Sequence, residues 1–318
     1  MARYLLRRLL QSLLLLALVS VIAFAILHLA PGGPLAQFVA TGDLGTEDVD
    51  RLMKQYGLDR PLPIQYLDWA GSIATGDWGN SYRDQLPVLK KIGMHVGPTL
   101  ELMVSSTLLA MFIGGMIGIL GAVRRYSIFD HLATIGAMVA LSIPTFWFGL
   151  AVIYVFSVNL GWLPAGNRET IGDGSFIDRL QHLVAPCIVL ALVSTAVWSR
   201  YMRSSMLDVV NQDYIRTAKS KGVPAMQILL RHALRNALLP MITITGLHVS
   251  TLLSGALVTE TVFTWPGMGR LFLDSVSNRD YPVVMGMLMF TACMVLLGSL
   301  VADLLYSVAD PRIKGASK

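Results

Sequence analysis

The sequence predicts an all-α integral membrane protein with six transmembrane helices. Of its 318 residues, 54% are hydrophobic and only 14% are charged, and the mean hydropathy is +0.60. Soluble domains carry about 25% charged residues, so the chain is too apolar to be one. Six apolar runs are long enough to cross a hydrocarbon core about 30 Å thick. The net charge of +5 is sorted between short segments, which indicates membrane topology rather than nucleic-acid binding.

The apolar runs place the six predicted helices in order along the chain. They cover residues 9–30, 98–123, 132–156, 181–199, 239–262 and 282–306. The first follows Arg3, Arg7 and Arg8, which resembles the start of a signal peptide, but an apolar part of about 20 residues favours a retained span. Pro144 and Pro186 fall inside the third and fourth helices, where we expect each to produce a kink.

The distribution of Lys and Arg predicts that both chain ends are cytoplasmic. With the N-terminus inside, 15 of the 25 Lys and Arg residues lie on the cytoplasmic side, seven of them between Arg200 and Arg235. Six of the ten on the outside lie in one long loop, 31–97. Long loops are translocated largely regardless of their charge, so these six do not contradict the orientation.

We expect the external loop 31–97 to form a small ordered cap that contains short helices. Thr46 and the acidic residues after it are suited to begin a helix, and the turn formers Gly57, Pro61 and Pro63 end it. A loop without fixed structure is the alternative, because its Trp and Tyr residues are also typical of an aromatic belt at the membrane surface.

The cytoplasmic segment YIRTAKSKGVPAMQILLRHALRNALLP, residues 214–240, is basic and half apolar. Asp213 is suited to be an N-cap, and the residues up to Lys221 make about two helical turns. Gly222 is suited to the left-handed position after a helix. A continuous helix through Gly222 and Pro224 would cost about 4 kcal/mol in propensity, so a turn is expected there. Pro224 then fits the first turn of a second helix.

Two interpretations of this segment remain open on physical grounds. The small residues Thr217 and Ala218 allow a helix to approach a partner closely, which favours docking into the groove of another protein. Alternatively, the segment lies on the membrane surface, with its basic face toward anionic headgroups and Ile228, Leu229 and Leu238 toward the acyl chains.

The spacing of Arg216-Thr217-Ala218, three residues, Gly222 and later Leu239-Pro240 resembles the cytoplasmic EAA motif in permease subunits of bacterial ABC importers. Arg and Thr replace the Glu and Ala of the motif name, and Leu-Pro comes several residues late. Both departures resemble the peptide and nickel branch of that family. The resemblance implies a coupling helix that docks on an ATPase subunit, with these residues at the contact: Tyr214, Arg216, Thr217, Ala218, Lys219, Lys221, Gly222, Leu239 and Pro240.

Further motifs extend the resemblance over nearly the whole chain. They are LHLAPGGP, GLDRPLPIQYLDW, GDWGNSY, LGWLPAG, ETVFTWPGMGRL, RDYP and ADPRI, and together they are similar to the B-type dipeptide/oligopeptide permease family. The resemblance implies the permease fold of type I ABC importers. Its parts are an N-terminal helix (1–30), an extracytoplasmic loop region (31–97), a five-helix core (98–306) with a coupling loop (200–238), and a cytoplasmic tail (307–318).

The energy for transport is expected to come from other subunits, because the chain contains no GxxxxGK[ST] phosphate-binding loop. The resemblance implies a second homologous permease, two ATPase subunits that bind ATP and Mg, and an extracytoplasmic substrate-binding protein, assembled in a bacterial inner membrane. It implies import of di- or oligopeptides by alternating access, with nickel chelates or glutathione as the alternative cargo. This chain is then a non-catalytic subunit without a cofactor of its own.

Two residues are candidates for the substrate path. Glu260 is an acidic residue near a span end, where we expect it to reach water or basic neighbours. Pro144 has the capacity to shape a cavity through a kink, and simple packing is the equal alternative. Asp303 is a weaker candidate near the inner surface. Cys187 and Cys293 are expected to be packing residues, and the six histidines lack zinc-site spacing, which argues against a metal site.

Two other classes of membrane protein fit the sequence less well. An intramembrane serine protease would need His248 to activate Ser254, but the two lie about 9 Å apart along one predicted helix and on different faces, and no GxSxG motif is present. An ion-coupled transporter would favour a repeat of three helices in each half, which the sequence does not contain. Co-purification of ATPase subunits distinguishes an ABC permease from both.

Overall fold

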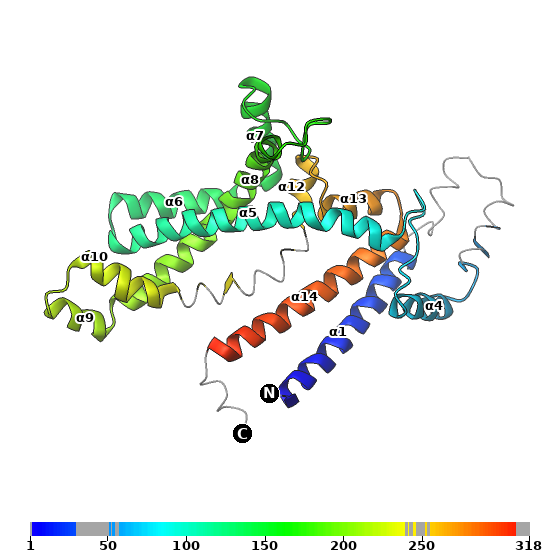
Figure 1. Cartoon of the computed structure of the whole chain (residues 1–318), viewed down its shortest axis with the longest axis horizontal. Coiled ribbons are helices and arrows are strands. Elements are labelled where there is room, and N and C mark those ends of the chain that lie inside the picture. Colours follow the sequence, from blue (N-terminus) through cyan, green and yellow to red (C-terminus); the bar gives the residue numbers. More distant parts are fainter. Residues whose placement is uncertain are drawn as a thin grey trace.

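The computed structural model describes residues 2–29, 51, 53–54, 57–238, 241, 244–245, 252 and 255–309, with side chains from residue 7 to residue 300. The regular elements among these residues are helices (Figure 1). The elements are α1 (Ala2–Leu29), α4 (Leu62–Ala74), α5 (Val88–Val123), α6 (Ile128–Ser142), α7 (Thr145–Val152), the π-helix η1 (Ile153–Asn159), α8 (Phe176–Val210), α9 (Asp213–Ser220), α10 (Ala225–Gln227), the π-helix η2 (Ile228–Leu234), α12 (Leu257–Val262), α13 (Met268–Ser277) and α14 (Tyr281–Ala309).

Four helices are long and apolar enough to cross a membrane, and they contain Arg7–Leu29, Val88–Val123, Phe176–Val210 and Tyr281–Leu300. A fifth candidate is the pair of Ile128–Ser142 and Thr145–Asn159, which passes the same test together. The all-helical membrane fold is therefore confirmed with four or five candidate spans among the described residues. Half of the predicted fifth helix, 239–262, lies outside them, and its described end forms α12.

The third predicted helix, 132–156, is interrupted at Pro144, where a bend was expected, and the chain turns by 99° between Ile128–Ser142 and Thr145–Asn159. Ile143 adopts an extended conformation (φ −79°, ψ 125°) and ends α6. A proline disfavours the helical region for the residue before it and cannot donate an N–H, so both effects end the helix at this point. Pro186, by contrast, lies inside α8 without interrupting it.

The central packing joins α5 to α8 through glycines. A Cβ on Gly118 would lie 2.6 Å from the carbonyl oxygen of Ser199 and 2.7 Å from Cβ of Met202. A Cβ on Gly114 would lie 2.8 Å from Cβ of Trp198, which is only 2% exposed. Glycine is thus required where the two backbones approach each other, as in other closely packed membrane helices.

The two ends of the chain meet at the side of this bundle. Figure 1 shows α1 and α14 side by side, and Phe24 of α1 packs with Met285 of α14. The short helix α4 packs against the same cluster through Tyr66 and Trp69. Pro61 was expected to help end a helix, together with Gly57. In the structure it follows the turn at Gly57 and is the N-cap of α4, so it begins a helix. The region 31–97 thus contains a short helix as expected, while residues 46–50 lie outside the described residues.

Candidate functional site

The short helix α9 is held to the molecule by one face. Ile215 is 1% exposed and Ala218 is 9% exposed, and both belong to a core cluster with Met206 of α8 and Ile228 and Ala233 of η2. The hydroxyl of Tyr214 accepts a hydrogen bond of 2.9 Å from Nδ2 of Asn236. The helix α9 therefore packs on both α8 and η2.

The end of α9 confirms the role predicted for Gly222. Its φ is +75°, in the left-handed region that favours glycine. Its N–H donates to the carbonyl of Lys219 at 3.0 Å, and the N–H of Val223 donates to that of Ala218 at 3.3 Å. These two bonds form a Schellman motif, in which glycine occupies the first position after the helix. The next helical residues begin directly after Pro224.

The outer face of α9 is exposed and basic. Tyr214, Arg216, Thr217, Lys219, Lys221 and Gly222 are all exposed. Arg216 is paired only loosely, with its Nη1 at 3.6 Å from Oδ1 of Asp213, and the side chains are 79% and 96% exposed. Leu239 and Pro240, the remaining two residues of the sequence-predicted contact, lie outside the described residues.

Three details of the sequence interpretation are wrong for this region. Asp213 is the first helical residue, and Gln212 precedes it as an N-cap without a side-chain hydrogen bond. Ala218 faces the core of the chain, so it anchors α9 and is not a small residue on the exposed surface. Ile228 is buried in the same core cluster, which removes it from the apolar face that was considered for membrane contact.

Glu260 is fully buried, which contradicts the expectation that it reaches water or basic side chains. Its Oε1 accepts hydrogen bonds from Oγ1 of Thr99 at 2.9 Å and from the N–H of Ala256 at 3.2 Å, and its Oε2 accepts from the N–H of Arg270 at 3.1 Å. A Cβ on Gly267 would lie 2.4 to 2.5 Å from this carboxyl group. The geometry indicates a brace between α5 and the α12–α13 region.

Pro144 lies in an exposed apolar hollow at the bend between α6 and α7. Phe146 and Trp147 line the same hollow and are 52% and 56% exposed. The proline therefore shapes the surface of the chain, and Glu260, the other residue predicted for the substrate path, does not line this hollow.

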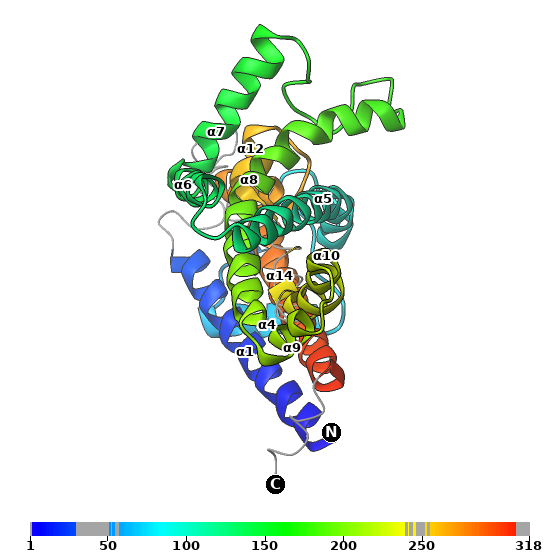
Figure 2. The ribbon, with the colours of Figure 1, turned by 90° about the vertical axis from the view of Figure 1, so that its left-hand side faces the viewer.

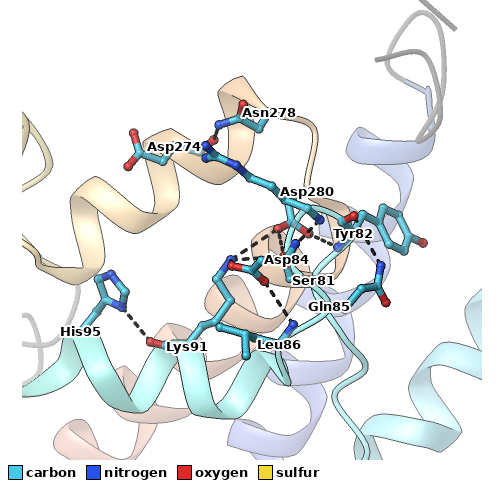
Figure 3. A network of polar contacts seen from close by, with 11 residues as sticks. Ser81, Tyr82, Asp84, Gln85, Leu86, Lys91, His95, Asp274, Asn278 and Asp280 are labelled. Carbon is cyan, nitrogen blue, oxygen red and sulfur yellow. Dashed lines mark hydrogen bonds and ion pairs between the residues drawn. The ribbon is translucent and has the colours of Figure 1, made fainter. Parts of the chain in front are cut away.

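A polar network at the opposite end of the molecule from α9 was not predicted (Figure 3). Asp280, between α13 and α14, is 2% exposed. Its Oδ2 accepts a hydrogen bond of 2.5 Å from the hydroxyl of Ser81, its Oδ1 accepts one of 3.0 Å from the N–H of Tyr82, and Nζ of Lys91 lies 3.8 Å away. Because Ser81 and Asp280 are 199 residues apart, no local pattern reveals the contact.

Asp84 extends this network toward solvent. Desolvation raises its pKa, but the hydrogen bonds from Lys91, the N–H of Leu86 and Ser81, together with the positive charge of Lys91, outweigh that effect. The pKa of Asp84 therefore lies below its ordinary value. Lys91 donates to Asp84 Oδ2 at 2.8 Å, so one lysine joins the exposed carboxylate to the network around Asp280.

No cluster of metal-ligating side chains occurs within the described ranges. His182 is buried, with Nδ1 at 2.7 Å from the carbonyl of Gly166 and Nε2 at 3.2 Å from Oγ1 of Thr170, so both nitrogens have structural partners. Cys187 is buried and free. His248, Ser254 and the side chain of Asp303 lie outside what the structure describes.

Comparison of the sequence with protein families shows which family the chain belongs to. Residues 114–315 match the family described as binding-protein-dependent transport system inner membrane component. The chain belongs to this family. Residues 1–102 match the model of its N-terminal part. The chain is therefore a non-catalytic, multi-pass component of an inner membrane transport system, and it works with ATPase and binding-protein partners.

Full-length relatives agree with this assignment. The chain is 45% identical over 316 residues, 99% of its length and 100% of the relative, to the oligopeptide transport system permease protein AppB of Bacillus subtilis. It is 38% identical, over 99% of both chains, to the dipeptide transport system permease protein DppB of Escherichia coli. It is also 38% identical to the di/tripeptide transport system permease protein DppB of Pseudomonas aeruginosa, over 93% of this chain and 94% of the relative.

Proposed function

We propose that this permease forms half of a translocation path for di- or oligopeptides. Its relatives are named as oligopeptide, dipeptide and di/tripeptide permeases, and they match it along almost the whole length. The other half is a second homologous permease, and two ATPase subunits and an extracytoplasmic binding protein complete the assembly. Six spans with both ends cytoplasmic are supported by the apolar runs and by the distribution of Lys and Arg.

The coupling element in this proposal is α9, and the observation that carries it is the contrast between its two faces. The inner face is fixed in the core by Ile215 and Ala218, whereas the outer face presents exposed Arg216, Thr217 and Lys219. A helix held in this way transmits a push instead of yielding to it. Closure of the ATPase pair then moves α8 and η2, and the spans rock between inward-open and outward-open states.

Glu260 supports this motion indirectly. Because its carboxyl group is buried and bonded to Thr99 and to backbone N–H groups, we assign it the task of bracing α12 and α13 against α5. Peptide selection is then left to the binding protein, and the permease needs only an undemanding path for the peptide backbone.

A photo-crosslinking experiment tests the coupling role. A photoreactive amino acid replaces Thr217, which is exposed on α9, or Thr75, which is exposed at the end of α4. After illumination of the assembled transporter, Thr217 should give a crosslink to an ATPase subunit, whereas Thr75 should give none. Crosslinks from Thr217 only to lipid would favour the membrane-surface interpretation and reject the coupling role.

Substrate class is tested by ATPase stimulation of the reconstituted transporter with its binding protein. Dipeptides and longer peptides should raise the rate above the basal level, whereas nickel chelates and glutathione should not. Stimulation by a nickel chelate alone would reject peptides as the cargo while leaving the coupling role intact.

A further inference from the structure

A groove of about 560 Å³ lies between α6 and α8 near the end of the bundle that carries α9. Figure 2 shows α6 and α8 side by side, and Ala137 of α6 packs against Ala196 of α8. Polar lining comes from Thr134 of α6 and from Arg200, Arg203 and Ser204 of α8, and apolar lining includes Val197.

The groove carries a net positive charge. Arg200 is exposed and has no ion pair or hydrogen bond within the described part of the chain. Arg203 holds the buried Asp130 through two bonds, from Nε at 2.6 Å and from Nη2 at 2.7 Å. Its charge is thereby balanced, but its Nη1 has no bond among the described residues. The planar fork of an arginine suits the oxygens of a phosphate group.

Apolar surface continues from the polar part of the groove toward the middle of the bundle. Met138 and Leu141 follow Thr134 by four and seven residues, so all three share one face of α6. These two side chains are 61% and 43% exposed. On α8, Val197 precedes Arg200 in the same direction. An arginine in the groove and exposed apolar side chains along α6 match an amphipathic anion, with its head at Arg200 and its chains along α6.

We propose that this groove binds an anionic phospholipid of the cytoplasmic leaflet, with Arg200 as the principal contact of its phosphate. Basic pockets between membrane helices on the cytoplasmic side are suited to such headgroups. The side of the membrane follows from the proposed orientation. Thr134, Ser204 and the free Nη1 of Arg203 supply further donors around the phosphate.

The test measures lipid retained by the assembled transporter in detergent, using native mass spectrometry. The probes are phosphatidylglycerol and phosphatidylcholine with the same acyl chains. Arg200→Gln should lower phosphatidylglycerol retention about fivefold, the contribution expected of one arginine near an anionic surface, and should leave phosphatidylcholine unchanged. Arg124→Gln is the matched control, because it removes an exposed arginine at the same end of the bundle and outside the groove.

Three results overturn the proposal. Equal losses in Arg200→Gln and Arg124→Gln would show a general effect of surface charge. Displacement of phosphatidylglycerol by a dipeptide with a free C-terminal carboxylate, but not by its amide, would assign the groove to cargo. If Arg200→Gln fails to assemble, Arg200→Ala takes its place, since it also removes the charge. Retention of phosphatidylglycerol by Arg200→Ala should then fall about fivefold, and unchanged retention rejects the proposal.

Discussion

Replacement of Asp280 by alanine should destabilise the end of the molecule opposite α9 more than any other single change in that network. The carboxyl group is 2% exposed and joins the loop of Ser81 and Tyr82 to the start of α14. Its removal leaves the hydroxyl of Ser81 and the N–H of Tyr82 without their acceptor. Lys91 keeps a partner, since Nζ also bonds to Asp84 at 2.8 Å.

The expected loss follows from these contacts. A hydrogen bond to a charged group contributes about 1.5 to 3 kcal/mol, and Asp280 accepts two. Tyr82 is half-buried, so part of the loss is recovered from water. We therefore expect Asp280→Ala to lower the free energy of unfolding by about 3 kcal/mol. Asp280→Asn should lower it less, because the amide keeps one oxygen acceptor.

Unfolding of the purified full chain in mixed micelles of rising SDS fraction measures this loss. With Cys293 replaced by serine in every variant, the reaction of Cys187, which is 8% exposed, with a thiol-specific dye reports the unfolded fraction. Asp84→Asn is the matched control in the same network, and because its side chain is 41% exposed it should cost at most about 1 kcal/mol. A loss for Asp280→Ala no larger than that of Asp84→Asn would refute the reasoning.

Three further predictions follow from individual contacts. Gly118→Ala should destabilise the chain by about 1 to 3 kcal/mol in the same assay, because a Cβ there meets backbone at 2.6 Å, whereas Gly115→Ala, with nothing within 4 Å, should be near neutral. Gly222→Val should lower transport per ATP hydrolysed in proteoliposomes while membrane insertion stays normal, because φ of +75° strains any branched residue; equal coupling in both proteins would contradict the role of α9. Since the native pKa of Asp84 is depressed, its pairing with Lys91 contributes stability above about pH 4 and loses it as the pH falls through the native pKa. The stability difference between wild type and Asp84→Asn should therefore shrink on acidification, and a constant difference would argue against it.

Local patterns were sufficient to predict the helical membrane fold and the turn after α9. Hydrophobic run length determines whether a segment enters the hydrocarbon core, and a glycine followed two residues later by proline determines where a helix ends. Gly222 adopts the predicted left-handed conformation for that reason. The family resemblance rested on motifs of the same local kind.

Only the tertiary structure decided which faces are buried and which distant residues meet. Ala218 is a small residue of the kind that suits a docking surface. In the fold, however, it is buried in the same core cluster as Ile228. Glu260 looks accessible by position near a span end, but Gly267 and Thr99 enclose it. The pairing of Ser81 with Asp280 joins segments 199 residues apart. Such contacts depend on how the helices pack against one another. The packed surfaces are built from several segments that are far apart in the sequence, so no single stretch of sequence reveals them.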